Sequence, residues 1–158
     1  MRAAKDPFTK SLRFQFTHMS EPIITIEDDP PVKDVRLLWD GLDQYNFSQT
    51  GLEGQLISVF LRNEQNEAIG GAHGWTAFGW LHIRALWLRE DQRQRGWGIR
   101  LLQATEAEAV KRGCRYSQLE TFSFQALGFY QKNGYRVFGE LENVAGDHKW
   151  YFLKKDLC

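Results

Sequence analysis

The sequence has few cysteines, few prolines and no excess of either charge. It contains two cysteines and four prolines among 158 residues, and 20 basic side chains balance 20 acidic ones. Two thiols, Cys114 and Cys158, do not form a disulfide framework, and their spacing is not that of a metal site. We therefore expect two free thiols and no bound metal.

Long apolar runs are also missing. No stretch approaches the ~18 to 20 apolar residues of a membrane helix, and no short apolar segment follows the N-terminal positive charges as in a secretory signal. These absences predict a cytoplasmic protein without a membrane partner. The hydrophobic content of 42% is sufficient for a single core.

The first 20 residues differ from the rest. Residues 1–20 carry four basic side chains and one acidic one, and His18-Met19-Ser20 resembles a cloning scar followed by a start. We interpret this segment as an expression leader, with a native or disordered basic arm as the alternative, and residues 21–158 as a single domain. The remainder carries 16 basic and 19 acidic residues, which argues against nucleic acid as the main partner.

The pattern of the first half predicts a strand, a helix and a meander. The weak alternation of Ile23–Ile26 predicts a short strand, and the two prolines that follow favour a helix that runs to about Tyr45. Three apolar segments separated by turns then predict antiparallel strands at 57–62, 68–76 and 80–88. The aromatic residues of the meander are expected mainly in the core, with one or two lining a ligand pocket: Trp75, Phe78, Trp80 and Trp87.

The second half contains the clearest helix. From Gly98 the apolar period changes, and Gly113 is expected to end the helix. One face of this helix collects Leu101, Leu102, Thr105, Ala109 and Val110. Later segments predict strands at 116–121, 135–141 and 149–154 and a short helix at 124–132, so the fold class is α/β (α+β).

The junction between the third strand and the long helix carries the chemistry. A glycine-bearing turn at a helix N-terminus presents free backbone N–H groups and the positive end of the helix dipole, an arrangement that binds phosphates. Gly96 and Gly98 open the backbone, and Arg93, Arg95 and Arg100 add positive charge. Alone, the pattern is equally typical of a plain tight turn, and it is neither a Walker loop nor a dinucleotide fingerprint.

Two motifs together resemble the GNAT (GCN5-related) N-acetyltransferase family. The segment 93–98, Arg-Gln-Arg-Gly-Trp-Gly, matches the family signature [Q/R]xxGx[G/A], and the segment 128–135 looks like its FYxxxGF/Y element. The resemblance covers 55–157. It implies the acyl-CoA N-acyltransferase fold, a mixed and mostly antiparallel central sheet flanked by helices.

The resemblance also implies a cosubstrate, acetyl-CoA, and a reaction in which an amine attacks the thioester directly. The implied coenzyme A contacts are Leu86, Leu88, Arg93, Gln94, Arg95, Gly96, Trp97, Gly98, Ile99 and Arg100. Tyr130 falls where many family members place the acid that protonates the departing thiolate. A core aromatic is the alternative role for that residue.

Two histidines are candidates for the base. His82 lies on the strand where histone-acetylating members carry a catalytic glutamate, and the strand alternation places His82, Arg84, Leu86 and Leu88 on one face. Many small relatives carry a carboxylate where this chain has Arg84. His148 resembles a Gly-x-His element that serves the substrate in some members. For both histidines a structural or surface role remains the alternative.

The acceptor is implied only as a class, a primary amine of a small molecule or peptide. Tyr45 and Asn46 lie where family members build the amine pocket, and Arg84 is a further candidate for substrate contact. The negative net charge of the domain slightly favours a cationic amine. The sequence does not indicate the oligomeric state, and the resemblance allows a homodimer, since dimers are common in the family. Alternatives are a non-catalytic acyl-CoA-binding or sensor domain on the same fold, and a nucleic-acid module that uses the arginines with Trp97.

Overall fold

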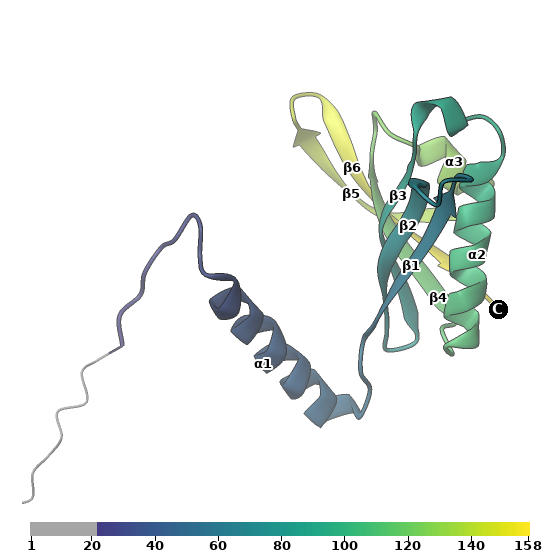
Figure 1. Ribbon diagram of the computed structural model, residues 1–158. Coiled ribbons are helices and arrows are strands. Elements are labelled where there is room, and N and C mark those ends of the chain that lie inside the picture. Colours follow the sequence, from purple (N-terminus) through teal and green to yellow (C-terminus); the bar gives the residue numbers. More distant parts are fainter. Residues whose placement is uncertain (1–21) are drawn as a thin grey trace, which may run out of the picture.

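The computed structural model describes residues 22–158, in which a twisted sheet carries two helices on one face (Figure 1). The leader predicted at 1–20 lies outside the described residues. In chain order the elements are α1 (Val32–Thr50), β1 (Gln55–Arg62), β2 (Ala68–Ala77), β3 (Trp80–Leu88), a 3-10 turn (Glu90–Gln92), α2 (Trp97–Lys111), β4 (Tyr116–Phe122), α3 (Leu127–Lys132), β5 (Arg136–Val144) and β6 (His148–Asp156).

The described strands form one sheet in the order β1-β2-β3-β4-β6-β5. Every neighbouring pair is antiparallel except β3 and β4, which are parallel and connected through α2. The meander of β1, β2 and β3 confirms the predicted hairpins. At its second turn both Phe78 and Gly79 have a positive φ, which lets the chain reverse within two residues.

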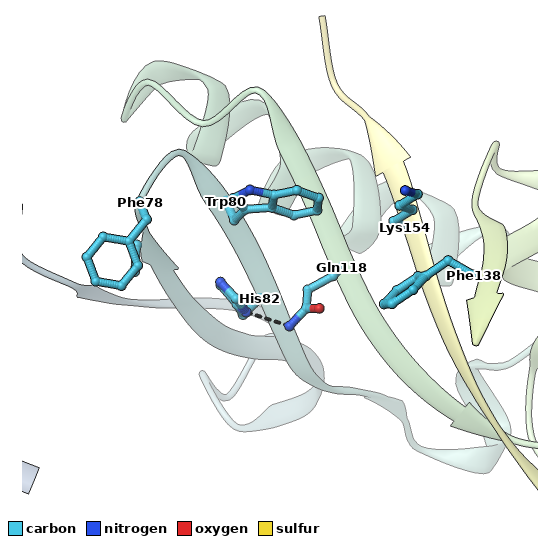
Figure 2. A pocket seen from close by; sticks show the side chains of 7 residues that line it. Phe78, Trp80, His82, Gln118, Phe138 and Lys154 are labelled. Atoms are coloured by element: carbon cyan, nitrogen blue, oxygen red, sulfur yellow. Dashed lines mark hydrogen bonds between the residues drawn. The ribbon is translucent and has the colours of Figure 1, made fainter. Parts of the chain in front are cut away.

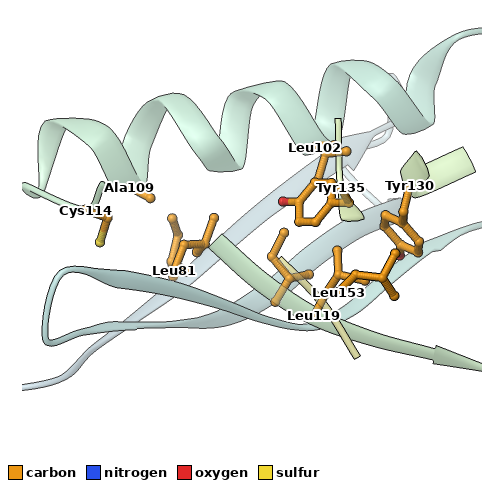
Figure 3. Packing of buried hydrophobic residues seen from close by; sticks show 10 residues of the cluster. Leu81, Leu102, Ala109, Cys114, Leu119, Tyr130, Tyr135 and Leu153 are labelled. Atoms are coloured by element: carbon orange, nitrogen blue, oxygen red, sulfur yellow. The ribbon is translucent and has the colours of Figure 1, made fainter. Parts of the chain in front are cut away.

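The core lies between the sheet and the two helices α2 and α3 (Figure 3). Leu102 and Ala109 of α2 pack over strand residues such as Leu81 and Leu153, which are fully buried. The predicted helix face is confirmed for four positions and wrong for Val110, which is exposed. Its place on the inner face is taken by Glu106, a charged residue that the apolar period could not indicate.

Glu106 is buried because two neighbours satisfy its carboxylate. The Tyr135 hydroxyl donates to one oxygen at 2.9 Å, and the Lys155 ammonium donates to the other at 2.7 Å. Ser117 of β4 completes the network through a 2.7 Å hydrogen bond to the same hydroxyl. The network therefore links α2 to both β4 and β6 across the core.

Helix α1 stands away from the sheet (Figure 1), and none of its residues is buried. It continues past the predicted end at Tyr45 to Thr50, where Gly51 adopts a left-handed conformation and ends it. The predicted strand at Ile23–Ile26 is wrong: these residues are exposed and form no regular structure in the described part of the chain. A segment of four alternating residues forms a strand only when it pairs with a neighbouring strand, and these residues pair with none of the described strands.

Candidate active site

The site is built where β3 and β4 part. The two strands are paired at four positions, from Trp80 opposite Tyr116 to Ile83 opposite Leu119. Beyond that point β3 continues to Leu88 and β4 continues to Phe122 without pairing to each other. The backbone groups that face this gap have no partner strand, so a ligand can hydrogen bond to them.

A β-bulge in β3 sits directly beyond the last paired position. Gly74 of β2 pairs with Ile83 and the preceding His73 pairs with Ala85, which leaves Arg84 as the extra residue. Because one extra residue reverses the alternation, Leu86 packs against the core while Arg84 points to the open face. The prediction that His82, Arg84, Leu86 and Leu88 share one face is therefore wrong.

The loop from β3 to α2 holds the segment 93–100, for which the sequence predicts a phosphate cradle, and we call this segment the cradle. Gly96 is the N-cap residue of α2 with a φ of 79°, and Gln94 is also left-handed with a φ of 59°. No side chain caps the helix, so the amides of its first turn are free to bind a ligand. These amides and the helix dipole together favour an anion at this position.

Three exposed arginines, Arg93, Arg95 and Arg100, surround the cradle. Arg93 donates its Nε–H to the carbonyl oxygen of Leu88 at 3.2 Å, which ties the loop to the end of β3. The guanidinium of Arg100 lies over the Trp97 ring, 4.4 Å from its centroid. The arginines therefore add positive charge beside the free amides.

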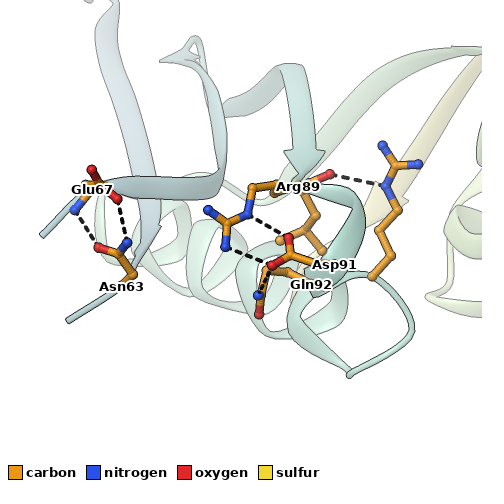
Figure 4. A network of polar contacts seen from close by, with 7 residues as sticks. Asn63, Glu67, Arg89, Asp91 and Gln92 are labelled. Atoms are coloured by element: carbon orange, nitrogen blue, oxygen red, sulfur yellow. Dashed lines mark hydrogen bonds and ion pairs between the residues drawn. The ribbon is translucent and has the colours of Figure 1, made fainter. Parts of the chain in front are cut away.

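The turn that precedes the cradle is held by a forked ion pair (Figure 4). Arg89 donates to both oxygens of Asp91 at 2.6 and 2.8 Å, and Gln92 donates to one of them at 2.9 Å. The hydrogen bond from Arg89, followed by that from Gln92, lowers the pKa of Asp91 to about 2. Asp91 is thus ionised at any working pH, and the turn keeps its shape.

Tyr130 lies on α3, on the helix-covered side of the sheet. Its ring packs edge-on against Phe129 and Tyr135, and only 7% of its surface is exposed. Burial raises the pKa of its phenol, so the hydroxyl keeps its proton at neutral pH. The hydroxyl makes no hydrogen bond within residues 22–158, yet it is not fully buried, so it retains access to solvent.

His82 faces a cavity of about 360 Å³ on the opposite side of the sheet (Figure 2). Its ring stacks on Trp75 with centroids 4.9 Å apart, and its Nδ1 lies 2.7 Å from the side-chain nitrogen of Gln118. The ring is half-buried, and this burial lowers its pKa below the ordinary value of 6.5. We call this cavity the open-face hollow; it is lined by Ala77, Phe78, Trp80, His82, Gln118, Phe138 and Lys154.

The open-face hollow gathers residues that the sequence did not single out. Gln118 comes from β4, Phe138 from β5 and Lys154 from β6, and only the strand register brings them beside His82. The aromatic residues expected mainly in the core are instead on this face: Trp75, Phe78 and Trp87 are 38%, 47% and 56% exposed. Phe78 and Trp80 line the hollow.

The other candidate residues lie outside the open-face hollow. His148 is exposed at the start of β6, where its Nδ1 is 3.2 Å from the Ser123 hydroxyl, and five residues separate it from Lys154. Arg84 lies 3.7 Å from Glu120 across the gap between β3 and β4. Asn46 lines a separate depression near Phe78, whereas Tyr45 is exposed on α1.

The acetyltransferase (GNAT) family profile matches residues 21–135. The chain belongs to this family. It is 32% identical over 117 residues to the acetyltransferase Atu2258 of Agrobacterium fabrum, covering 73% of this chain and 85% of that one. It is 36% identical over 104 residues to the blasticidin-S acetyltransferase of Streptomyces morookaense, covering 65% and 76%.

A solved structure supports the same assignment. The crystal structure of an acetyltransferase from Bacillus cereus superimposes with a TM-score of 0.69 at 32% identity, covering 84% of this chain and 97% of the other. The predicted fold class and family are therefore confirmed, and the protein is an acetyltransferase. No helix within residues 22–158 is long and apolar enough to cross a membrane.

Proposed function

We propose that this GNAT protein transfers the acetyl group of acetyl-CoA to a primary amine held in the open-face hollow. The observation that carries the proposal is that the cradle directly follows β3, the strand that separates from its parallel neighbour β4 to leave a gap. The cradle supplies free amides and arginines for a pyrophosphate. The gap supplies unpaired strand groups for an extended arm that leads from the cradle toward His82.

Acid and base approach the gap from opposite faces of the sheet. Tyr130 lies on the face covered by α2 and α3, and His82 lies on the open face. Phe129, next to Tyr130, lies close to Gly98 of the cradle, so α3 sits beside the expected path of coenzyme A. An acceptor can therefore enter from the open side while the cosubstrate occupies the other.

The proposed reaction joins the amine nitrogen to the acetyl carbonyl carbon and breaks the carbon–sulfur bond. His82 takes a proton from the ammonium through its Nε2 to give the neutral amine that attacks, and the nitrogen then loses its second proton to solvent. Tyr130 donates its proton to the departing thiolate before solvent returns one to the phenol. An alkyl amine is mostly an ammonium at neutral pH, since its pKa is ~10.4, so a neutral His82 is needed. Burial keeps it neutral.

The test is release of free thiol from acetyl-CoA with a panel of amines. The panel contains polyamines, amino acids, peptides, aminoglycosides and blasticidin S, because one relative is named for that antibiotic. Steady release with at least one acceptor class is expected. Binding of acetyl-CoA without any release would instead favour the sensor alternative.

The role of His82 is tested by its pH dependence. Because the neutral ring is the active form and burial lowers its pKa, kcat/KM should rise with pH through a midpoint below 6.5. A His82→Ala variant should lose that limb and at least about 100-fold in kcat. The control is His73→Ala, a histidine on the same face that is bonded to Ser58 at 2.8 Å. Equal rates in both variants would refute the assignment.

A further inference from the structure

Gln118 contacts one of the two ring nitrogens of His82. The contact joins Gln118 Nε2 to His82 Nδ1 at 2.7 Å, and it lies at the last but one paired position of β3 and β4. In Figure 2 the other ring nitrogen points toward the side of Phe78 and Trp80. Trp75 stacks on the ring at an interplanar angle of 7°, so the imidazole cannot easily rotate away.

The chemistry of the contact decides which nitrogen of His82 can act as a base. An amide NH₂ can only donate, so in this arrangement Nδ1 is an acceptor and the neutral ring carries its proton on Nε2. A ring in that form offers a donor, not a lone pair, to the open-face hollow. The proposed reaction needs the reverse.

Proton uptake itself favours the other orientation of the amide. When His82 becomes an imidazolium, Nδ1 also carries a proton and needs an acceptor, whereas an amide NH₂ in the same place would oppose it. Turning the Gln118 amide by 180° exchanges its nitrogen and oxygen at nearly constant volume. The amide oxygen then accepts from Nδ1–H, and Nε2 is free to take the proton.

We propose that Gln118 is a positioning residue: its amide oxygen holds His82 in the Nδ1–H form and stabilises the imidazolium that forms during acetyl transfer. This inference rests on the proposed function of His82 as the base. Three charged groups also face this region, Arg84 of β3, Glu120 of β4 and Lys154 of β6. These three groups are unchanged in the variants described below, so they do not contribute to differences in the pH profile between those variants and wild type.

Two variants separate the alternatives. Gln118→Leu removes the hydrogen bond, and Gln118→Glu supplies a group that can only accept. The control for the added charge is Gln65→Glu, in the exposed turn between β1 and β2. The first measurement is the ¹⁵N shift pattern of His82 in ¹⁵N-histidine-labelled protein above its pKa, with its signals assigned from their loss in His82→Ala.

Wild type and Gln118→Glu should both show Nδ1–H, and Gln118→Leu should show a growing share of Nε2–H. In kinetics Gln118→Leu should lower kcat about tenfold or more with an unchanged KM for acetyl-CoA. Gln118→Glu should move the acid limb of kcat/KM upward by about one pH unit or more, since a carboxylate favours the charged ring. Gln65→Glu should match wild type in both measurements.

The inference is overturned if wild-type His82 carries its proton on Nε2 at the pH of greatest activity. It is also overturned if the tautomer is the same in wild type and Gln118→Leu. These spectra need no turnover. If His82→Ala retains full activity, the proposed base is wrong, whereas the change of tautomer in Gln118→Leu still decides whether Gln118 positions the ring.

Discussion

The two halves of the β3–β4 pair differ in how they are held. In the closed half, Trp80–Ile83 pair with Tyr116–Leu119, and the buried network of Glu106 locks β4 to the core from below. In the open half, Arg84 and Glu120 meet only at 3.7 Å across the gap, and both remain partly exposed. The closed half therefore has the contacts that stabilise the fold, whereas the open half leaves unpaired backbone groups that a ligand can reach.

A substitution beside the β3 bulge is expected to have the largest effect on the difference between the closed and open halves. A Cβ at Gly74 would overlap the carbonyl oxygen of His82, because β2 and β3 approach closely beside the extra residue. Gly74→Ala should therefore lower the free energy of unfolding by about 3 kcal/mol and shift His82, with activity nearly lost. Denaturant unfolding and thiol release measure the two effects. A variant with wild-type stability and rate would contradict the role given to the bulge.

The sequence predicted α2 well and the open half poorly. The buried face formed by Leu101, Leu102, Thr105 and Ala109 follows directly from the helical period, and the turn before the helix follows from Gly96. The bulge left no trace in the sequence, because a single extra residue at Arg84 looks like ordinary alternation. It alone reversed the prediction for Leu86 and Leu88.

Other parts of the site depended on pairing between distant segments. Gln118, Phe138 and Lys154 come from three strands, and no local pattern places them beside His82. The helical period could not indicate the burial of Glu106, because that burial depends on Tyr135 and Lys155 far along the chain. Such sites can be located only once the strand order is known.

The second largest effect is expected at Tyr130. Tyr130→Phe keeps the ring and its packing but removes the proton donor, so kcat should fall by about 100-fold while acetyl-CoA affinity stays nearly the same. Single-turnover kinetics and calorimetric titration separate the two quantities. The unfolding temperature serves as the control for packing. An unchanged kcat would return Tyr130 to a purely structural role in the core.

A change in the closed half should do the opposite. Glu106→Ala leaves the Lys155 ammonium partly buried without its partner, and it removes the acceptor of the Tyr135 hydroxyl. Because Lys155 is about a quarter exposed, we expect a loss of about 2 kcal/mol in the free energy of unfolding, less than for a fully buried pair. At a temperature where the variant is folded, kcat should match wild type. A large loss of kcat would show that the halves are not separable.

The smallest effect is expected at the cradle. Gly96 has a φ of 79°, and an added methyl group would meet open space, so Gly96→Ala should cost about 1 kcal/mol in stability through backbone strain alone. Relief of that strain should displace the first amides of α2 and weaken coenzyme A binding about fivefold. The matched control is Gly146→Ala, with a φ of 89° and equal space in the β5–β6 turn. It should lose similar stability and keep full affinity.

The central claim is that main-chain amides at the start of α2 bind the pyrophosphate of coenzyme A. The most direct measurement is a ¹H–¹⁵N titration of the labelled protein with coenzyme A. The claim predicts the largest shifts at the amides of 94–100, with Gly96 and Gly98 among them, and smaller shifts along the gap between β3 and β4. Saturable binding that leaves those amides unshifted, or no binding at all, would contradict it.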